Sequence, residues 1–151
     1  MSTGGDEMSR DPWQLRVFRK ADELAVRMYE STKDFPPNER FGLQAQLRRA
    51  ALSVPTNIVE GSARSSARDY LHFLNTAQSS ASESRYLIHI SGRLGLFPQG
   101  IRDELWAGFD EVCRGLQQLA NSIMELERAK RARARRSEAR GQRPEVRGLE
   151  V

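Results

Sequence analysis

Asp69 and His72 are the two residues whose types and spacing come closest to metal chemistry. A carboxylate three residues ahead of a histidine on one helix is the pairing found in di-iron bundles. That centre requires a second such pair and inward carboxylates on two further helices, and the sequence has no second pair. His72 also follows Tyr70, at a predicted core position, by two places, which is about 200° around a helix and points it away from the core. We therefore predict no metal site.

The remaining reactive side chains offer no catalytic arrangement. His89 has no carboxylate close to it in the sequence, and Cys113 follows Val112 on a predicted bundle helix, where a small buried residue is the usual interpretation. The sequence contains no phosphate-binding glycine-rich loop and no nucleophile elbow. We predict no catalytic residue, no cofactor and no small-molecule substrate, so the chain is not expected to be an enzyme.

Ser53, Asn57 and Glu60 form a polar stripe at steps of four and three along one helix, about 60° or more from its apolar seam. One interpretation is a ligand site or a contact with another subunit. The other is a hydrogen-bonded network that satisfies carbonyl groups freed by Pro55 and fixes the register of the bundle. The structural interpretation is favoured, because buried polar groups near a proline kink need partners in any case.

Four arginines lie along the same helix and the loop that follows it: Arg48, Arg49, Arg64 and Arg68. Guanidinium groups hold phosphates through paired hydrogen bonds, so these side chains are candidates for binding nucleic acid. A solvated helix face, with each arginine paired to an acid one turn away, is the alternative interpretation.

Basic residues are concentrated at the C-terminal end. Nine basic residues against three acidic ones give residues 128–151 a net charge of +6, so residues 1–127 contribute −2 to the chain's +4. Such a segment binds polyanions by charge alone, although similar segments also serve only as solubilising extensions. The candidate nucleic-acid-binding residues in it are Lys130, Arg131, Arg133, Arg135 and Arg136.

Two helices are predicted to position the polar stripe and the first arginines. The first begins near Pro12, which suits the first helical position, and ends at a pair of prolines. The second carries an apolar seam at steps of four and three from Leu43 to Gly61. Pro55 lies inside it and is expected to kink it without breaking it, because the apolar register continues on both sides.

Two further helices complete the pattern. The third is predicted to start at Ser66, has small residues along its middle and ends at Gly95. The fourth has the strongest periodic signal of the chain, an unbroken seam from Ile101 to Leu126. Beyond Arg128 the apolar positions shrink to alanine and then vanish, so the helix is expected to fray there.

Four amphipathic helices with short connections predict an all-α protein, folded as an up-down-up-down four-helix bundle. We divide the chain into a disordered N-terminus at residues 1–11, the bundle at residues 12–128 and a basic, disordered tail at residues 129–151. The sequence lacks an apolar run of about 18 residues, and its first residues lack the apolar stretch of a secretory signal. A lone cysteine suits a reducing compartment, so a cytoplasmic protein without a membrane partner is expected.

A family resemblance rests mainly on the second predicted helix, which reads QLRRAALSVPTNIVEG from Gln46 to Gly61. This stretch resembles the signature of four-helix-bundle proteins encoded in intervening sequences of large-subunit ribosomal RNA genes. The resemblance covers roughly residues 12–126, from Trp13 through the segment 69–74 to the turn at Leu94 and Gly95. It leaves the basic tail outside.

The resemblance implies properties that the residues alone do not show. The family includes the accessory variability determinant of diversity-generating retroelements, a pentameric ring of bundles that works with a reverse transcriptase and binds nucleic acid. We accordingly expect a homo-oligomeric, ring-like pentamer that acts as a scaffold or adaptor and engages RNA, DNA or a nucleic-acid enzyme. The alternative is a purely structural oligomer or protein-interaction module without a nucleic-acid role.

Overall fold

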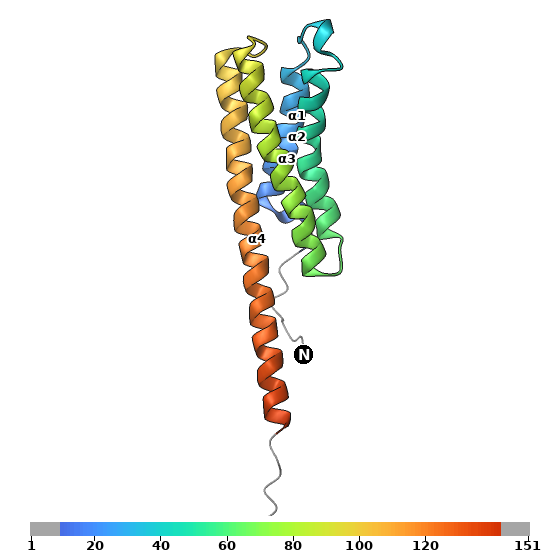
Figure 1. Ribbon diagram of the computed structural model, residues 1–151, viewed down its shortest axis with the longest axis vertical. Coiled ribbons are helices and arrows are strands. Elements are labelled where there is room, and N and C mark those ends of the chain that lie inside the picture. The colour runs from blue at the N-terminus through green and yellow to red at the C-terminus, as the bar shows by residue number, and fades with distance from the viewer. Residues whose placement is uncertain (1–9, 143–151) are drawn as a thin grey trace, which may run out of the picture.

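The computed structural model describes residues 10–142, which form helices and connections without any strand. The elements in chain order are η1 (Pro12–Gln14), α1 (Arg16–Ser31), η2 (Pro37–Glu39), α2 (Leu43–Ser62), α3 (Ala67–Arg93) and α4 (Gln99–Gly141). The four α-helices run alternately up and down (Figure 1). The all-α, four-helix prediction is therefore confirmed.

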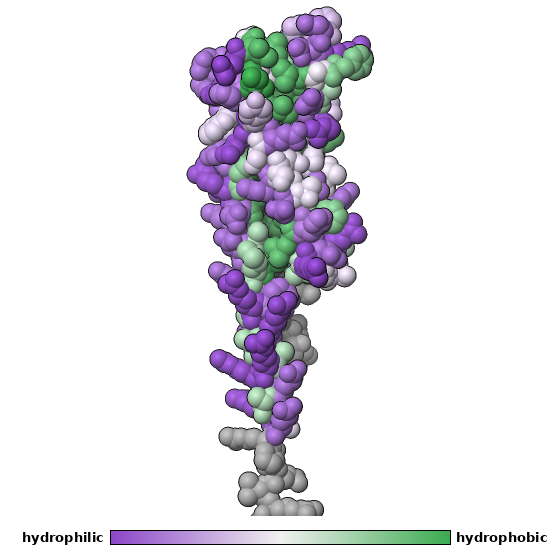
Figure 2. Space-filling model, in the orientation of Figure 1, coloured by the Kyte–Doolittle hydropathy of each residue, from purple (hydrophilic) through white to green (hydrophobic). Residues whose placement is uncertain are grey.

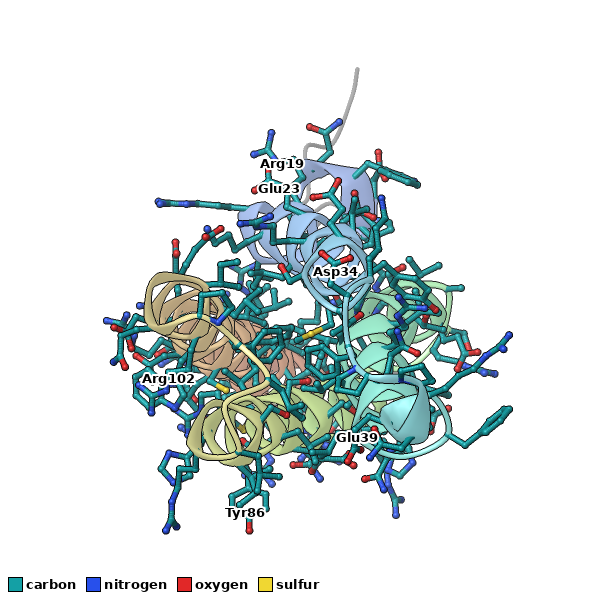
Figure 3. The ribbon with its side chains drawn as sticks, turned by 90° about the horizontal axis from the view of Figure 1, so that it is seen from above. Arg19, Glu23, Asp34, Glu39, Tyr86 and Arg102 are labelled. Carbon is teal, nitrogen blue, oxygen red and sulfur yellow. The ribbon has the colours of Figure 1, made fainter. Side chains whose placement is uncertain are left out.

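The four helices enclose one core. Each α-helix packs against the next in the chain, and α1 also packs against α4, which closes the bundle. Viewed along the axis, the helices surround a centre filled with side chains (Figure 3). The largest fully buried side chains come from the predicted seams of all four helices: Met28, Leu47, Ile58, Leu74, Ile88, Leu105, Phe109 and Leu116.

The first helix begins later than predicted. Asp11 accepts a hydrogen bond from the backbone N–H of Trp13 at 3.1 Å, but it caps the short turn η1 rather than α1. Leu15 has extended backbone angles, so the α-helix starts only at Arg16. The extended residue interrupts the helix, and the Trp13 ring lies edge-on against Phe18 with 4.9 Å between centroids.

Both ends of α3 follow the predicted signals. At its start, the Ser66 hydroxyl accepts a hydrogen bond from the backbone N–H of Asp69 at 3.1 Å. At its end, Gly95 adopts a φ of 73°, which glycine tolerates because it has no Cβ. The N–H of Leu96 then bonds to the carbonyl of Ser91 at 2.9 Å, closing a Schellman turn.

The contact between α2 and α3 depends on small residues. α2 continues through the buried Pro55 without a break, as predicted. Near its end, a Cβ added to Gly61 would lie 2.8 Å from the Cβ of Phe73 and 2.9 Å from Cδ2 of Tyr70. The two helices therefore approach closely at this point only because residue 61 lacks a side chain.

α4 does not end where the sequence predicted. It continues as a helix through Gly141, so the predicted disordered tail is wrong for residues 129–141. Residues 129–140 contain neither glycine nor proline and are mostly alanine, arginine, lysine and glutamate, which are strong helix formers. The remaining parts of the two predicted disordered ends, residues 1–9 and 143–151, lie outside the described residues.

The helices of the described chain are not membrane spans. Between residues 10 and 142, no helix has both the length and the apolar character that crossing a bilayer requires.

Candidate nucleic-acid interface

The last four turns of α4 project beyond the bundle as a basic helix (Figure 1). The last fully covered side chain of this helix is Ile123, and every residue from Arg128 to Gln142 is exposed. We call residues 128–141 the α4 extension; at 1.5 Å per residue it is about 21 Å long. Among the described residues 10–142 it has no neighbouring helix, because α1, α2 and α3 all lie beside the part of α4 that precedes it (Figure 1).

The α4 extension accounts for the whole net positive charge that the sequence assigns to residues 128–151, because residues 142–151 carry no net charge. It has one acidic residue, Glu138, and a net charge of +6. Its cations are Arg128, Lys130, Arg131, Arg133, Arg135, Arg136 and Arg140. Within the described part of the chain, its ion pairing is limited to Lys130 and Glu127, whose nitrogen and oxygen lie 3.6 Å apart. On the face drawn in Figure 2, this segment is hydrophilic with isolated alanines.

Arg48, by contrast, is engaged inside the bundle. Its Nε donates a hydrogen bond to the hydroxyl of Thr32 at 2.9 Å, and Nη2 donates to the carbonyl of Tyr29 at 3.2 Å. Its guanidinium also lies over the Tyr29 ring, 4.7 Å from the centroid. Thr32 is fully buried, so this arginine joins α2 to the C-terminal end of α1.

The other three predicted arginines do not join Arg48 in one cluster. Arg49 lies on the opposite flank of α2 and pairs with Glu83 of α3, with Nη2 and Oε1 2.5 Å apart. Arg64 and Arg68 lie past the other end of α2, about 20 Å of helix away. Arg64 places its guanidinium 4.6 Å from the centroid of the Phe73 ring, and Arg68 is exposed. The structure therefore brings none of these side chains together with Arg48.

Two residues of the polar stripe form hydrogen bonds within the bundle, and one of these bonds reaches α3. The hydroxyl of Ser53 lies 2.9 Å from the hydroxyl of Ser80, and Nδ2 of Asn57 donates to the carbonyl of Ser53 at 2.8 Å. Pro55 has no N–H to donate to the carbonyl of Ala51. The bond from Asn57 goes instead to the carbonyl of Ser53, two residues further along, so it does not satisfy the carbonyl that Pro55 frees. Glu60, the third predicted member, is exposed. Ser53 therefore forms a helix-to-helix contact, and Asn57 supports it from within α2 by donating to the carbonyl and hydroxyl of Ser53.

The residues considered for metal or redox chemistry lie apart. Asp69 and His72 are both exposed. In residues 10–142 no group of three or more histidine, cysteine or acidic residues is close enough to hold a metal ion. Cys113 is a buried free thiol whose Sγ lies 3.9 Å from the hydroxyl of Ser82.

Several helix-to-helix ion pairs were not anticipated from the sequence. Arg27 of α1 holds Glu104 of α4 through two hydrogen bonds, of 3.0 and 3.2 Å. The hydrogen bond from Arg27 keeps the pKa of the Glu104 carboxyl below its usual value. Arg85 of α3 lies 2.5 Å from the carboxylate of Asp110, with its guanidinium 5.4 Å from the centroid of the Trp106 ring. These partners are far apart in sequence, so no local spacing reveals them.

Comparison with known proteins identifies a family to which this chain is similar. A sequence profile described as 23S rRNA-intervening sequence protein matches residues 13–118. Comparison with curated protein sequences gives no match. Among solved structures, the chain is similar to a protein of unknown function from the S23 ribosomal protein family of Bacteroides thetaiotaomicron, at 24% identity and a TM-score of 0.65. That similarity covers 70% of this chain and 95% of the other, and it shows the fold alone. The α4 extension lies outside the residues that the family profile matches.

The contacts of Arg48 and Arg49 predict different effects on stability. Replacing Arg48 by alanine removes hydrogen bonds to a buried hydroxyl and to a helix-end carbonyl, and we expect it to cost about 1–2 kcal/mol. Replacing Arg49 by alanine removes the same charge from an exposed pair and is expected to cost less than about 0.5 kcal/mol. Urea unfolding of both variants measures the difference. Equal unfolding midpoints would show that Arg48 does not join the helices.

Proposed function

The chain belongs to the 23S rRNA-intervening sequence protein family, and from that premise we propose that it is a non-enzymatic, homo-oligomeric scaffold that binds nucleic acid through the α4 extension. The observation that supports the proposal is the position of the charge. The net charge of +6 lies on a helix that no other part of the bundle covers, whereas residues 1–127 carry −2.

The initial association with nucleic acid is electrostatic and does not depend on the base sequence. Each cation that reaches a phosphate releases a counterion, and on a duplex the logarithm of affinity falls with that of salt by roughly 0.9 per phosphate neutralised. The arginines of the bundle contribute less, because Arg27, Arg49 and Arg85 already pair with carboxylates. The lone thiol of Cys113 fits a reducing compartment such as the cytoplasm.

Self-association is supported by apolar side chains that the single chain leaves uncovered. Five of them lie on α1, α2 and the connection between these helices, and they are between 41% and 88% exposed: Val26, Tyr29, Phe41, Leu52 and Val59. α1 and α2 pack against each other, and exposed apolar side chains on neighbouring elements favour a protein–protein contact where they form one patch. The family resemblance implies a pentamer, in which five α4 extensions on one assembly would raise the effective concentration of cations near one strand.

The same apolar side chains also favour the second candidate, an oligomer that serves protein contacts alone. The two candidates share the assembly and differ in the role of the α4 extension. A test of assembly and a test of nucleic-acid binding therefore separate them.

We predict that the purified chain has a molecular mass larger than that of a dimer, because the uncovered apolar side chains of α1 and α2 need a partner. Light scattering at micromolar concentration measures this mass. Leu52→Glu should lower it, since it places a charge in the uncovered region, while Ser79→Glu, at an exposed site on α3, should not. A monomer mass for the unaltered chain would contradict the oligomeric part of the proposal.

We also predict that ending the chain at Arg128 weakens binding to oligonucleotides by about 10- to 100-fold at low salt, since six of the seven cations of the α4 extension are lost. Ending it at Gly141 is the matched control, because residues 142–151 contain two basic and two acidic residues and carry no net charge. Fluorescence anisotropy at roughly 50 and 200 mM salt measures the affinities. The protein-only alternative is correct if the full chain does not bind. A bundle site is correct if truncation leaves binding intact and Arg64→Ala with Arg68→Ala removes it.

A further inference from the structure

We infer that the α4 extension binds duplex DNA as one continuous helix lying in the major groove. The inference rests on the proposed function and goes further, because it names the form of nucleic acid and the way it is held. It follows from three properties of the extension: its diameter, the placement of its cations around the helix axis, and its lack of tertiary cover.

The diameter of the helix decides between the forms of nucleic acid. An α-helix with its side chains is about 10–12 Å across, and the major groove of B-form DNA is about 12 Å wide. The major groove of an RNA duplex is too narrow and deep for such a helix. Single strands are bound by stacking bases on aromatic rings, and residues 128–141 contain no aromatic residue. Duplex DNA is therefore the form that fits.

The cations surround most of the helix but leave one arc empty. Because each residue advances about 100°, Arg128, Arg131 and Arg135 form one flank, and Lys130 and Arg133 lie roughly opposite them. The arc of about 100° between Arg131 and Lys130 has no cation and holds Ala134 and Glu138. The two cationic flanks match the two phosphate walls of a groove, and the arc with the single acid then faces away from the DNA.

The face opposite that arc suits the floor of the groove. Three alanines, Ala129, Ala132 and Ala139, lie on it together with Arg136 and Arg140. Small side chains let the backbone approach the bases, and arginine is the side chain that most often contacts guanine there. A membrane surface does not fit this pattern. An interfacial helix needs a face of large apolar side chains, and residues 128–141 contain none.

The lack of tertiary packing makes the helix of the α4 extension sensitive to a bound ligand. The packed part of α4 nucleates the extension, but no other described residue packs against it, and the like-charged pairs Arg131 with Arg135 and Arg136 with Arg140, four residues apart, oppose the helix. Phosphates on both sides would neutralise those charges. Binding to duplex DNA should therefore raise the helix content of the chain.

The test breaks the helix without changing its charge. Ala134 lies eleven residues beyond Ile123, the last buried residue of α4, and on the arc that faces away from the DNA. Ala134→Pro removes one helical hydrogen bond and clashes with the carbonyl of Lys130, whereas Ala134→Ser keeps the helix and is the matched control. Both full-length variants are compared with the unaltered chain on one sequence prepared as duplex DNA, duplex RNA and single-stranded DNA.

The expected result is that Ala134→Pro weakens binding to duplex DNA by about tenfold or more, while binding to single-stranded DNA changes less than about twofold. Ala134→Ser should match the unaltered chain. Circular dichroism at 222 nm should show a gain of helix when duplex DNA is added to the unaltered chain and a smaller gain for Ala134→Pro. Equal melting temperatures of the three proteins confirm that the bundle is intact.

Other outcomes overturn the inference and leave the proposed function standing. If Ala134→Pro binds duplex DNA as tightly as the unaltered chain without a gain of helix, the extension acts as an unstructured polycation. If duplex RNA binds as tightly as duplex DNA, groove width does not select the nucleic acid. If the unaltered chain binds none of the three at low salt, the proposed function itself is wrong and the inference falls with it.

Discussion

α4 is much longer than the helices around it, and this difference determines which part of α4 has a core and which part does not. α4 has 43 residues, whereas α1, α2 and α3 have 16, 20 and 27. An apolar seam is stable in water only where other helices cover it, and the buried side chains of α4 accordingly run from Leu105 to Ile123. Past that point the sequence supplies alanine and arginine, whose intrinsic propensity favours a helix where no core packs against it. One helix therefore forms both a packed part of the bundle and the exposed extension outside it.

Inside the bundle, polar and charged groups hold helices to one another. Ser53 and Ser80 meet between α2 and α3, Arg48 joins α2 to the end of α1, and Arg27 holds Glu104 across α1 and α4. Each of these contacts occupies a side chain that would otherwise be available to a ligand. The exposed cations that remain are concentrated on the α4 extension, so the same packing that stabilises the bundle also decides where a polyanion is attracted.

The sequence predicted those features that depend on local spacing. Helical seams, the cap at Ser66 and the turn at Gly95 follow from residue type and period, and the structure has each of them. It did not predict that Leu15 interrupts the first helix, because the packing of Trp13 on Phe18 is tertiary. The sequence does not predict the end of α4, because its apolar seam ends near Leu126 while alanine and arginine continue to favour a helix beyond it. The four arginines near α2 are adjacent in sequence but divided in space, since neighbouring residues on a helix point about 100° apart.

The α4 extension is a helix that no other described residue packs against, and in our proposal duplex DNA supplies the contacts that stabilise it. Hydrogen–deuterium exchange of the full chain, followed peptide by peptide with and without duplex DNA, tests this proposal most directly. We predict rapid exchange over residues 128–141 in the free protein and marked slowing when DNA is added, with residues 105–123 equally protected in both states. Strong protection of residues 128–141 without DNA would mean that protein already covers the extension. Unchanged rapid exchange with DNA bound would mean that the extension forms no stable helix on DNA, and either result would show that DNA does not stabilise this helix.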